Sequence, residues 1–216
     1  MTDSPVKVID NFLPNEVFRP LAYQLMTYDG YRCCDYTTFP HEADGSIDWY
    51  GEVRNPLNTD SEIHLHEAFM ALKVYDRIHS SEWISDIYHH QRAEMEILYQ
   101  RLNCWKMLLM RVNCTFAASE HYSGKWHTDL DTHPHDHESN TCLLYLNRNN
   151  GGTRFKVGDT IESVQSEPNR AVIFPGTLEH AGVWCTDKKL RFVLNINYVP
   201  NKENEQEQER SLDNSV

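Results

Sequence analysis

The chain has 216 residues, a net charge of −12 and 40% hydrophobic residues. This length suits one domain with a single sizeable core. No apolar run approaches the roughly 20 residues of a membrane-spanning helix, and the first ten residues lack the basic and apolar stretches of a secretory signal. The acidic balance disfavours a nucleic-acid partner, because a duplex-binding surface needs clustered Lys and Arg. We therefore expect a single domain over residues 1–200, cytoplasmic by default and with no membrane contact, and a disordered polar tail over 201–216.

The six cysteines agree with a reducing compartment. They include no C-x-x-C pair that would indicate a zinc or redox site. Cys114 and Cys142 fall in strand-like segments, where a free thiol usually acts as a small buried hydrophobe. We expect the cysteines to be structural or incidental.

The N-terminal segment is predicted to contain a short strand and then a helix. Residues 6–12 form the strand, and Pro14 suits the first turn of the helix that follows. The apolar residues of this helix recur at helical spacing. Its predicted buried stripe comprises Phe18, Leu21, Leu25 and Met26.

The next segments are predicted to be a long irregular stretch and two more helices. Residues 28–58 are rich in aromatic residues, Gly and Pro, so they form either a lid or substrate wall, or an ordinary surface loop. Residues 61–78 and 82–102 are predicted to be helical, with Ser80 or Ser81 capping the second helix. These helices are expected to support the packing of the domain.

The second half of the chain has the pattern of an antiparallel β-structure. Short strand-like runs alternate with strong turn signals such as Asn149-Asn150-Gly151-Gly152 and Pro175-Gly176. Many short strands separated by turns indicate a sandwich or barrel. The predicted strands are 110–117, 125–129, 141–146, 152–157, 171–174 and 190–199.

His127, Asp129 and His180 are candidate metal ligands. On a strand, His127 and Asp129 would share one face with Cα atoms about 6.6 Å apart, and His180 follows the Phe174-Pro175-Gly176 turn. Two imidazoles and one carboxylate leave open positions on the metal, as in non-haem Fe(II) oxygenases. Those positions can admit a bidentate keto acid and O2. The alternative is that these are three ordinary polar residues, since the His-x-Asp pattern is common by chance.

Arg191 is the fourth candidate. Along 190–199 the even positions are apolar and should pack against helices, which directs Arg191 into the barrel. An inward guanidinium needs a partner, and a carboxylate pairs with it bidentately. This favours a keto diacid as ligand, although a structural salt bridge remains the alternative.

At this point the chain resembles a known family. Residues 122–198 resemble the Fe(II)/2-oxoglutarate-dependent dioxygenases, and within them the prolyl-hydroxylase-like branch. The resemblance covers nearly the whole chain before the tail. The matching stretches are 141–147, 151–155 and 174–180, ending at Arg191, together with the opening segment 8–14.

The resemblance implies an α+β, mainly β fold: a distorted double-stranded β-helix (jelly-roll, cupin-like) core at about 107–200, packed by N-terminal helices. It implies that His127, Asp129 and His180 bind Fe(II), and that Arg191 holds the distal carboxylate of 2-oxoglutarate. The cofactors it implies are Fe(II), 2-oxoglutarate and O2, with ascorbate as a further candidate.

The resemblance also assigns three residues around the cosubstrate. Tyr145 matches a tyrosine that hydrogen-bonds the same carboxylate, and Leu143 would line that pocket. Tyr122 matches a cosubstrate or substrate tyrosine, although the loop between it and the metal motif is short. Val193 departs from the Arg-x-Ser pattern of the wider superfamily, so a hydroxyl contact to the cosubstrate is missing. A packed core tyrosine is the alternative for Tyr145.

The reaction implied is hydroxylation of a C–H bond with release of succinate and CO2. The substrate would be a peptidyl proline or another amino-acid side chain. Two alternatives stay open: a same-fold oxygenase of a free small molecule, and a non-catalytic cupin-like module that binds a metal or ligand. His133, His135 and His137 are predicted to lie in a solvated loop, with substrate contact or a second metal as alternatives. Trp126, on the face opposite His127, is expected to pack.

Overall fold

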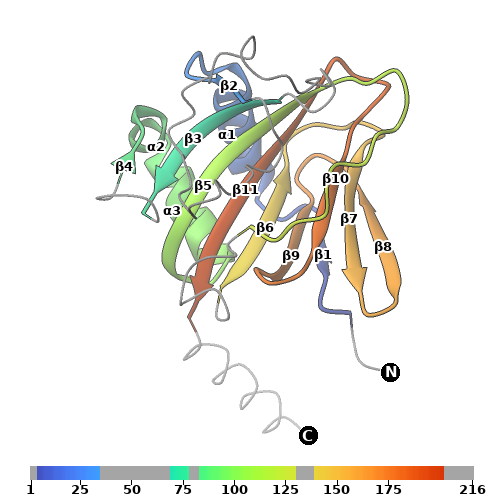
Figure 1. Cartoon of the computed structure of the whole chain (residues 1–216). Helices are drawn as coiled ribbons and strands as arrows, with labels where there is room; N and C mark the ends of the chain where they lie inside the picture. Colours follow the sequence, from blue (N-terminus) through green and yellow to red (C-terminus); the bar gives the residue numbers. More distant parts are fainter. Residues whose placement is uncertain (1–3, 35–68, 78–82, 130–138, 202–216) are drawn as a thin grey trace, which may run out of the picture.

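The computed structural model describes residues 4–34, 69–77, 83–129 and 139–201 (Figure 1). The helices are α1 (Asn15–Thr27), α2 (Asp86–His90) and α3 (Arg92–Arg101). The strands are β1 (Lys7–Ile9), β2 (Arg32–Cys34), β3 (Phe69–Asp76), β4 (Trp83–Ile84), β5 (Cys104–Phe116), β6 (Asn140–Tyr145), β7 (Gly152–Val157), β8 (Thr160–Gln165), β9 (Ala171–Pro175), β10 (His180–Val183) and β11 (Leu190–Pro200).

Two antiparallel sheets form the core of the described residues. The larger sheet has the order β1-β9-β6-β11-β5-β3-β2, with β4 paired to β3, and the smaller has the order β10-β7-β8. Their inner faces meet where Phe155 of β7 packs with Tyr145 of β6, Phe174 of β9 and Val193 of β11. The alternation of short strands and turns predicted an antiparallel sandwich or barrel, and the two sheets form the jelly-roll core that the family resemblance implies.

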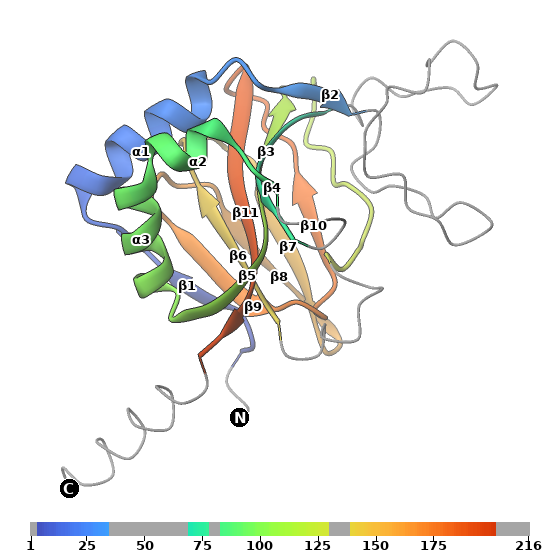
Figure 2. The same ribbon diagram turned by 90° about the vertical axis from the view of Figure 1, so that its left-hand side faces the viewer.

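The outer face of the larger sheet is covered by α1 and α3, as Figure 2 shows. Side chains alternate along β11: its even residues point to the helices and its odd residues point inward, between the two sheets. The predicted stripe of α1 is confirmed for Phe18, Leu21 and Leu25, and Met26 is only half-buried. The core on this side joins residues of α1, α3, β5 and β11.

The pair of long strands β5 and β11 sets the geometry of the interior. In their register, Arg191 lies opposite Thr115, Val193 opposite Asn113, and Asn195 opposite Arg111. Directly opposed residues of an antiparallel pair point to the same face. The inner face therefore carries a ladder of mainly polar side chains, whereas the outer face of the same strands is apolar.

The prediction of a helix over residues 61–78 is wrong, because residues 69–76 form β3. β3 pairs with β5 on one side and β2 on the other. The predicted helix over 82–102 is interrupted: β4 comes first, and α2 and α3 meet at Gln91. Its cap is Ser85, which accepts a hydrogen bond from the Tyr88 amide, and not Ser80 or Ser81, which lie outside the described residues.

The predicted strand over 125–129 is reduced to one isolated bridge at His127. β8 and β10 were not expected from the sequence. The segment 28–58 contains β2, and the rest of it from residue 35 lies outside the described residues. The same holds for the loop with His133, His135 and His137, and for the tail from residue 202.

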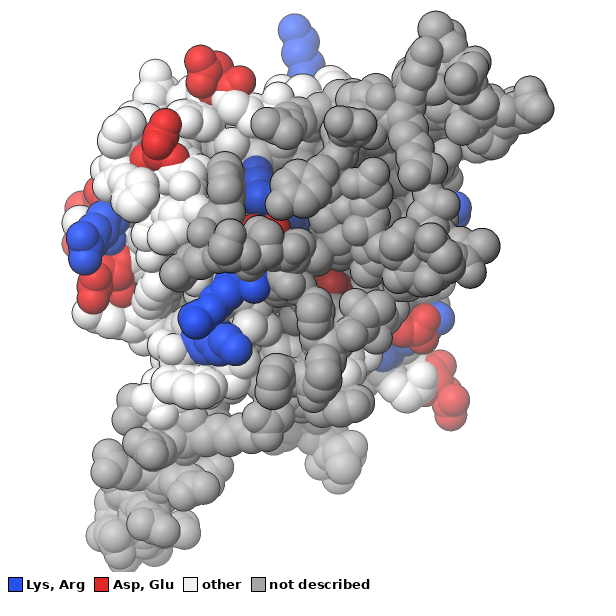
Figure 3. Space-filling model, turned by 60° about the vertical axis from the view of Figure 1, so that its left-hand side comes forward, with Lys and Arg blue, Asp and Glu red and all other residues white. Residues whose placement is uncertain are grey.

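Charged side chains of both signs are scattered in small groups over the face seen in Figure 3. Among the described residues, none of the helices has the length and apolar character that crossing a membrane requires. Four described cysteines, Cys104, Cys114, Cys142 and Cys185, are free thiols, and all but Cys104 are buried.

Candidate metal and cosubstrate site

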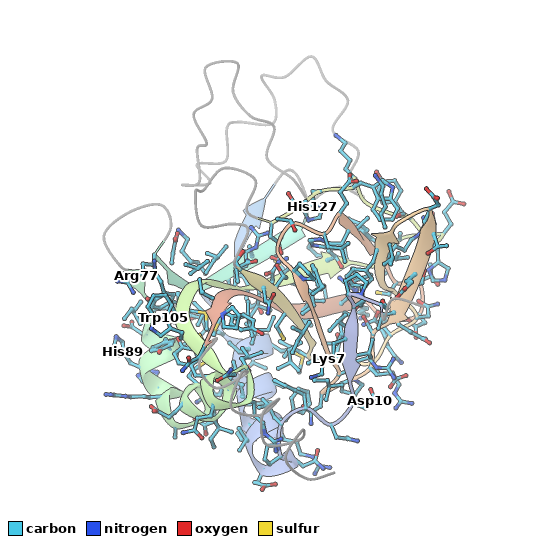
Figure 4. The ribbon with its side chains drawn as sticks, turned by 90° about the horizontal axis from the view of Figure 1, so that it is seen from below. Lys7, Asp10, Arg77, His89, Trp105 and His127 are labelled. Atoms are coloured by element: carbon cyan, nitrogen blue, oxygen red, sulfur yellow. The ribbon has the colours of Figure 1, made fainter. Side chains whose placement is uncertain are left out.

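His127, Asp129 and His180 converge, as the sequence predicts. Their ligand atoms all lie within 4.8 Å of one another. His127 and His180 face each other across an isolated antiparallel bridge with two backbone hydrogen bonds of 3.0 and 2.9 Å. Figure 4 shows His127 at one edge of the molecule, well separated from Lys7 and Asp10 near the N-terminus. The bridge places the imidazoles side by side even though residues 125–129 form no regular strand.

Both histidines present the same nitrogen to the centre of the cluster. Nδ1 of His127 lies 3.0 Å from the carbonyl oxygen of Lys125, and Nδ1 of His180 lies 3.1 Å from that of Leu178. A carbonyl oxygen only accepts, so each Nδ1 carries a proton, and in the neutral form of the imidazole the lone pair is then on Nε2. The Nε2 atoms lie 3.9 and 3.7 Å from the Asp129 carboxylate. Neutral imidazoles held in this tautomer are ready metal ligands.

Asp129 is held by a buried network of polar side chains. The amide of Asn195 donates to both carboxylate oxygens at 3.2 and 3.1 Å, and the Thr141 hydroxyl lies 3.2 Å from one of them. Asn197 joins the two, since its amide donates to Asn195 and its oxygen accepts from Thr141. Burial alone would raise the pKa of Asp129. His180, His127, Arg111 and the Asn195 hydrogen bond outweigh burial and hold that pKa below its usual range.

His180 is fixed by aromatic side chains between the sheets. The rings of Phe155 and Phe174 have centroids 6.2 and 4.9 Å from its imidazole. Burial lowers the pKa of His180, and the neighbouring Asp129 only partly opposes this effect. The imidazole therefore stays neutral near pH 7, the form in which histidine binds a metal.

Arg191 is buried and lines the cavity that His127 and His180 also line, directed inward as predicted. Its Nη2 donates to the carbonyl oxygen of Gly152 at 2.8 Å, and its Nε lies 3.3 Å from the Ser166 hydroxyl. Its Nη1 donates to no described residue, and Gly182 beside it leaves space, because a Cβ there would lie 4.0 Å from Nη1. Burial lowers the pKa of Arg191, with Tyr145 acting in the opposite direction. Since arginine stays protonated in proteins, a cation with a free donor edge faces the cavity.

A single cavity joins the histidines to Arg191. Of the predicted cosubstrate residues, Leu143 lines it but Tyr145 and Tyr122 do not. The Tyr145 hydroxyl donates to Thr153 at 2.8 Å, and the Arg191 guanidinium stands 5.6 Å over its ring. The ring of Tyr122 packs edge-on against Trp184 with centroids 5.3 Å apart. Trp126 packs as expected, beneath the cationic groups of Arg154 and Lys156.

Sequence reasoning missed several residues of this cavity. Those on β5 have a signal in the sequence, because Arg111, Asn113 and Thr115 alternate with the apolar Val112 and Cys114. The same holds for Asn195, which lies on the Arg191 face of β11. Nothing in the sequence indicated Gly182 or Trp184, which enter the cavity only through the pairing of β10 with β7 and the loop after it.

The donor set fits a divalent transition metal. Two imidazoles and one carboxylate converge, and both histidines line the adjoining cavity, which matches the ligand set of non-haem iron enzymes. The fold is that of the Fe(II)/2-oxoglutarate-dependent oxygenases, with a jelly-roll core of the prolyl-hydroxylase-like type.

Comparison with solved structures gives this fold directly. A prolyl-4-hydroxylase from Pseudomonas putida matches with a TM-score of 0.50 and 13% identity over 93% of this chain and 95% of that one. A Trichoplax adhaerens prolyl hydroxylase, in complex with a peptide fragment of the hypoxia inducible factor oxygen degradation domain, matches with a TM-score of 0.52 and 14% identity over 97% and 87%. The non-haem α-ketoglutarate-dependent epimerase SnoN from nogalamycin biosynthesis matches with a TM-score of 0.55 and 10% identity over 91% and 77%.

No protein-family model matches the sequence, and no curated protein matches it either. At these low identities the likeness is one of fold, so the chemistry of the site rests on its own residues.

Proposed function

We propose that this chain is an Fe(II)- and 2-oxoglutarate-dependent dioxygenase that hydroxylates a C–H bond and releases succinate and CO2. The observation that carries the proposal is that one cavity is lined both by the two histidines of a His-Asp-His cluster and by a buried arginine with a free donor edge. A structural salt bridge, the alternative for Arg191, has no support among the described residues, because the bonds of its guanidinium go to uncharged oxygens.

His127, Asp129 and His180 would hold the iron. When bound, Fe(II) and 2-oxoglutarate would activate O2, the oxidant that attacks an unactivated C–H bond, with one oxygen atom going to succinate and the other to the hydroxylated product. The protein fixes the ligand atoms through the Lys125 and Leu178 carbonyls and the Asn195 amide. Such supporting hydrogen bonds set the orientation of the ligands and their affinity for the metal.

Arg191 would bind the distal carboxylate of 2-oxoglutarate through its free edge. Thr153 lines the cavity and links this arginine to Tyr145, since its hydroxyl oxygen accepts from Tyr145 and lies 3.4 Å from Arg191 Nη2. We propose that Tyr145 positions the cosubstrate through Thr153 and Arg191, that Leu143 packs against its carbon chain, and that Tyr122 acts by holding Trp184 at the cavity wall.

The substrate proposed first is a peptidyl proline or another amino-acid side chain. The peptide bound by the Trichoplax adhaerens enzyme supports this choice. The SnoN epimerase shows that the same fold also occurs in an enzyme of nogalamycin biosynthesis, so a free small molecule is the second candidate.

Anaerobic addition of Fe(II) and 2-oxoglutarate to the purified protein tests the proposal. We expect a weak visible charge-transfer band that is absent in His180→Ala and preserved in His89→Ala, whose histidine is exposed on α2. Under air, the wild-type protein should convert 2-oxoglutarate to succinate, with and without ascorbate. A wild-type protein that gives neither the band nor succinate contradicts the proposal and favours a non-catalytic binding module.

A further inference from the structure

Three polar side chains on β5 line the cavity without hydrogen-bond partners. The Nε of Arg111, the Oδ1 of Asn113 and the Oγ of Thr115 are buried, and none is hydrogen-bonded within the part of the chain that the structure describes. A buried polar atom without a partner costs about 1–3 kcal/mol. Three of them in succession on one strand face indicate a surface that is completed by a ligand.

The strand register places these three groups along the site. Arg111 lies opposite Asn195, which holds the metal-ligand candidate Asp129, and Thr115 lies opposite Arg191. Asn113 lies between them, opposite Val193. These three side chains of β5 therefore form a wall that runs from the metal end of the cavity to the cosubstrate end. Arg111, the cation of this wall, lies at the metal end.

Arg111 has no carboxylate of its own among the described residues. Its charge lowers the pKa of Asp129 and of His180 from a distance, but no ion pair joins it to either residue. On its other side the register sets it against Lys73 of β3, and the neighbouring carboxylate, Asp76, is bound by Lys73 at 2.7 Å. Like charges directly opposed across strands are destabilising. An anion in the cavity beside Arg111 would therefore offset the repulsion between Arg111 and Lys73.

The formal charges give the same result once the proposed ligands are in place. A divalent metal, Asp129, Arg191 and a dianionic 2-oxoglutarate sum to zero. Two cations of the cavity wall are then left over: Lys125, which is exposed to solvent, and Arg111 at the metal end, where the oxidised carbon must lie. In the proposed arrangement the distal carboxylate of 2-oxoglutarate would go to Arg191, and the metal would neutralise the charge of its other carboxylate, so the charge of Arg111 would remain for an anion of the substrate.

We propose that Arg111 binds a carboxylate of the substrate, and that Asn113 accepts a hydrogen bond from an N–H or O–H group of the same molecule. The substrate is thus an acid with a neighbouring donor, as in an N-acyl amino acid or a peptide with a free carboxylate near the oxidised carbon. This inference rests on the function proposed above, and it names the substrate class of that site. It makes Arg111 and Asn113 specificity-determining residues, distinct from the residues that hold metal and cosubstrate.

Paired compounds test the inference. The protein with Fe(II) and 2-oxoglutarate is titrated anaerobically by calorimetry with N-acetyl amino acids, each as the free acid and as its primary amide. We expect at least one acid to bind about 10–100-fold more tightly than its amide, the range expected for a hydrogen bond to a charged group. Arg111→Gln should abolish this ratio, and Arg111→Lys should keep part of it. Arg92→Gln, an exposed arginine on α3, should leave the ratio unchanged.

Two results would overturn the inference. The first is a panel in which no acid binds more tightly than its amide. The second is a loss of 2-oxoglutarate affinity in Arg111→Gln comparable to that in Arg191→Gln, which would assign Arg111 to the cosubstrate. The charge-transfer band of the wild-type protein is recorded separately, so absence of the band refutes the proposed function, whereas a present band with equal acid and amide binding refutes only this inference.

Discussion

Replacing Asn195 with leucine tests whether the polar network behind Asp129 governs metal binding. The substitution roughly keeps the side-chain volume but removes the amide that contacts both carboxylate oxygens at 3.2 and 3.1 Å. It also leaves the Asn197 amide without its acceptor at 3.0 Å. Hydrogen bonds to a charged group contribute about 1.5–3 kcal/mol, and an orphaned buried donor costs about 1–3 kcal/mol. We therefore expect the metal-free variant to lose about 3–5 kcal/mol of unfolding free energy.

The affinity for the metal should fall as well, because the carboxylate is no longer oriented. Loss of such a supporting contact typically weakens metal binding about 10–100-fold. Titration with Mn(II) under anaerobic conditions measures the dissociation constant, and urea unfolding followed by circular dichroism measures stability.

Asn147→Leu is the matched control for this experiment. Asn147 accepts from the Phe192 amide at 2.9 Å and donates to the Leu190 carbonyl at 2.8 Å, away from the metal ligands. It should lose comparable stability while keeping the wild-type metal affinity. If Asn195→Leu folds and binds Mn(II) within about twofold of the wild type, the network does not set metal affinity and the reasoning fails. Thr141→Val, which removes only the hydroxyl, is the milder variant should Asn195→Leu not fold.

Three further predictions follow from burial and charge. Phe155→Ala should cost about 3–5 kcal/mol and also weaken metal binding, because His180 packs on that ring; a stability loss with unchanged Mn(II) affinity would contradict the second part. Cys142 is fully buried, and burial raises the pKa of its thiol. Maleimide should therefore label Cys142, as located by mass spectrometry, only after unfolding and not in the native protein at pH 8. The hydrogen bonds and charge of Arg170 hold the pKa of Asp10 below its usual range, so this pair adds stability above about pH 4 that is lost as pH falls through the native pKa. Because Asp10 is exposed, Asp10→Asn should cost less than about 1 kcal/mol at pH 7 and flatten the acid limb of the stability curve, and a larger loss in urea unfolding would count against this account.

The site residues that could be predicted from the sequence are those with strong local patterns. The alternation along 190–199 directs Arg191 inward because a strand buried on both faces must place one residue set toward the helices and the other toward the cavity. The sequence also predicted that His127 and His180 lie close together, but it did not predict the backbone contact that causes this. A backbone bridge between the two histidines brings them together, and this pairing depends on the fold of the intervening strands.

β3 could not be predicted because its burial does not alternate. Leu72, Val74, Tyr75 and Asp76 are all buried, and a register irregularity lies between Lys73 and Tyr75. Their spacing and the helix-favouring Ala71, Leu72 and Lys73 resemble a helical stripe. Only pairing with β5 and β2 selects the strand, and that information lies far along the chain. Tertiary contacts here override local propensity.

The two faces of β5 separate the requirements of folding from those of recognition. Met110, Val112 and Cys114 are buried in the core beneath the helices, while Arg111, Asn113 and Thr115 line the cavity. Substitutions at the odd positions would change what the cavity accepts without creating a void in the core. Families of enzymes with new substrate preferences could thus diverge through a few codons of one strand. Directed evolution of this chain would best begin with saturation libraries at those three positions.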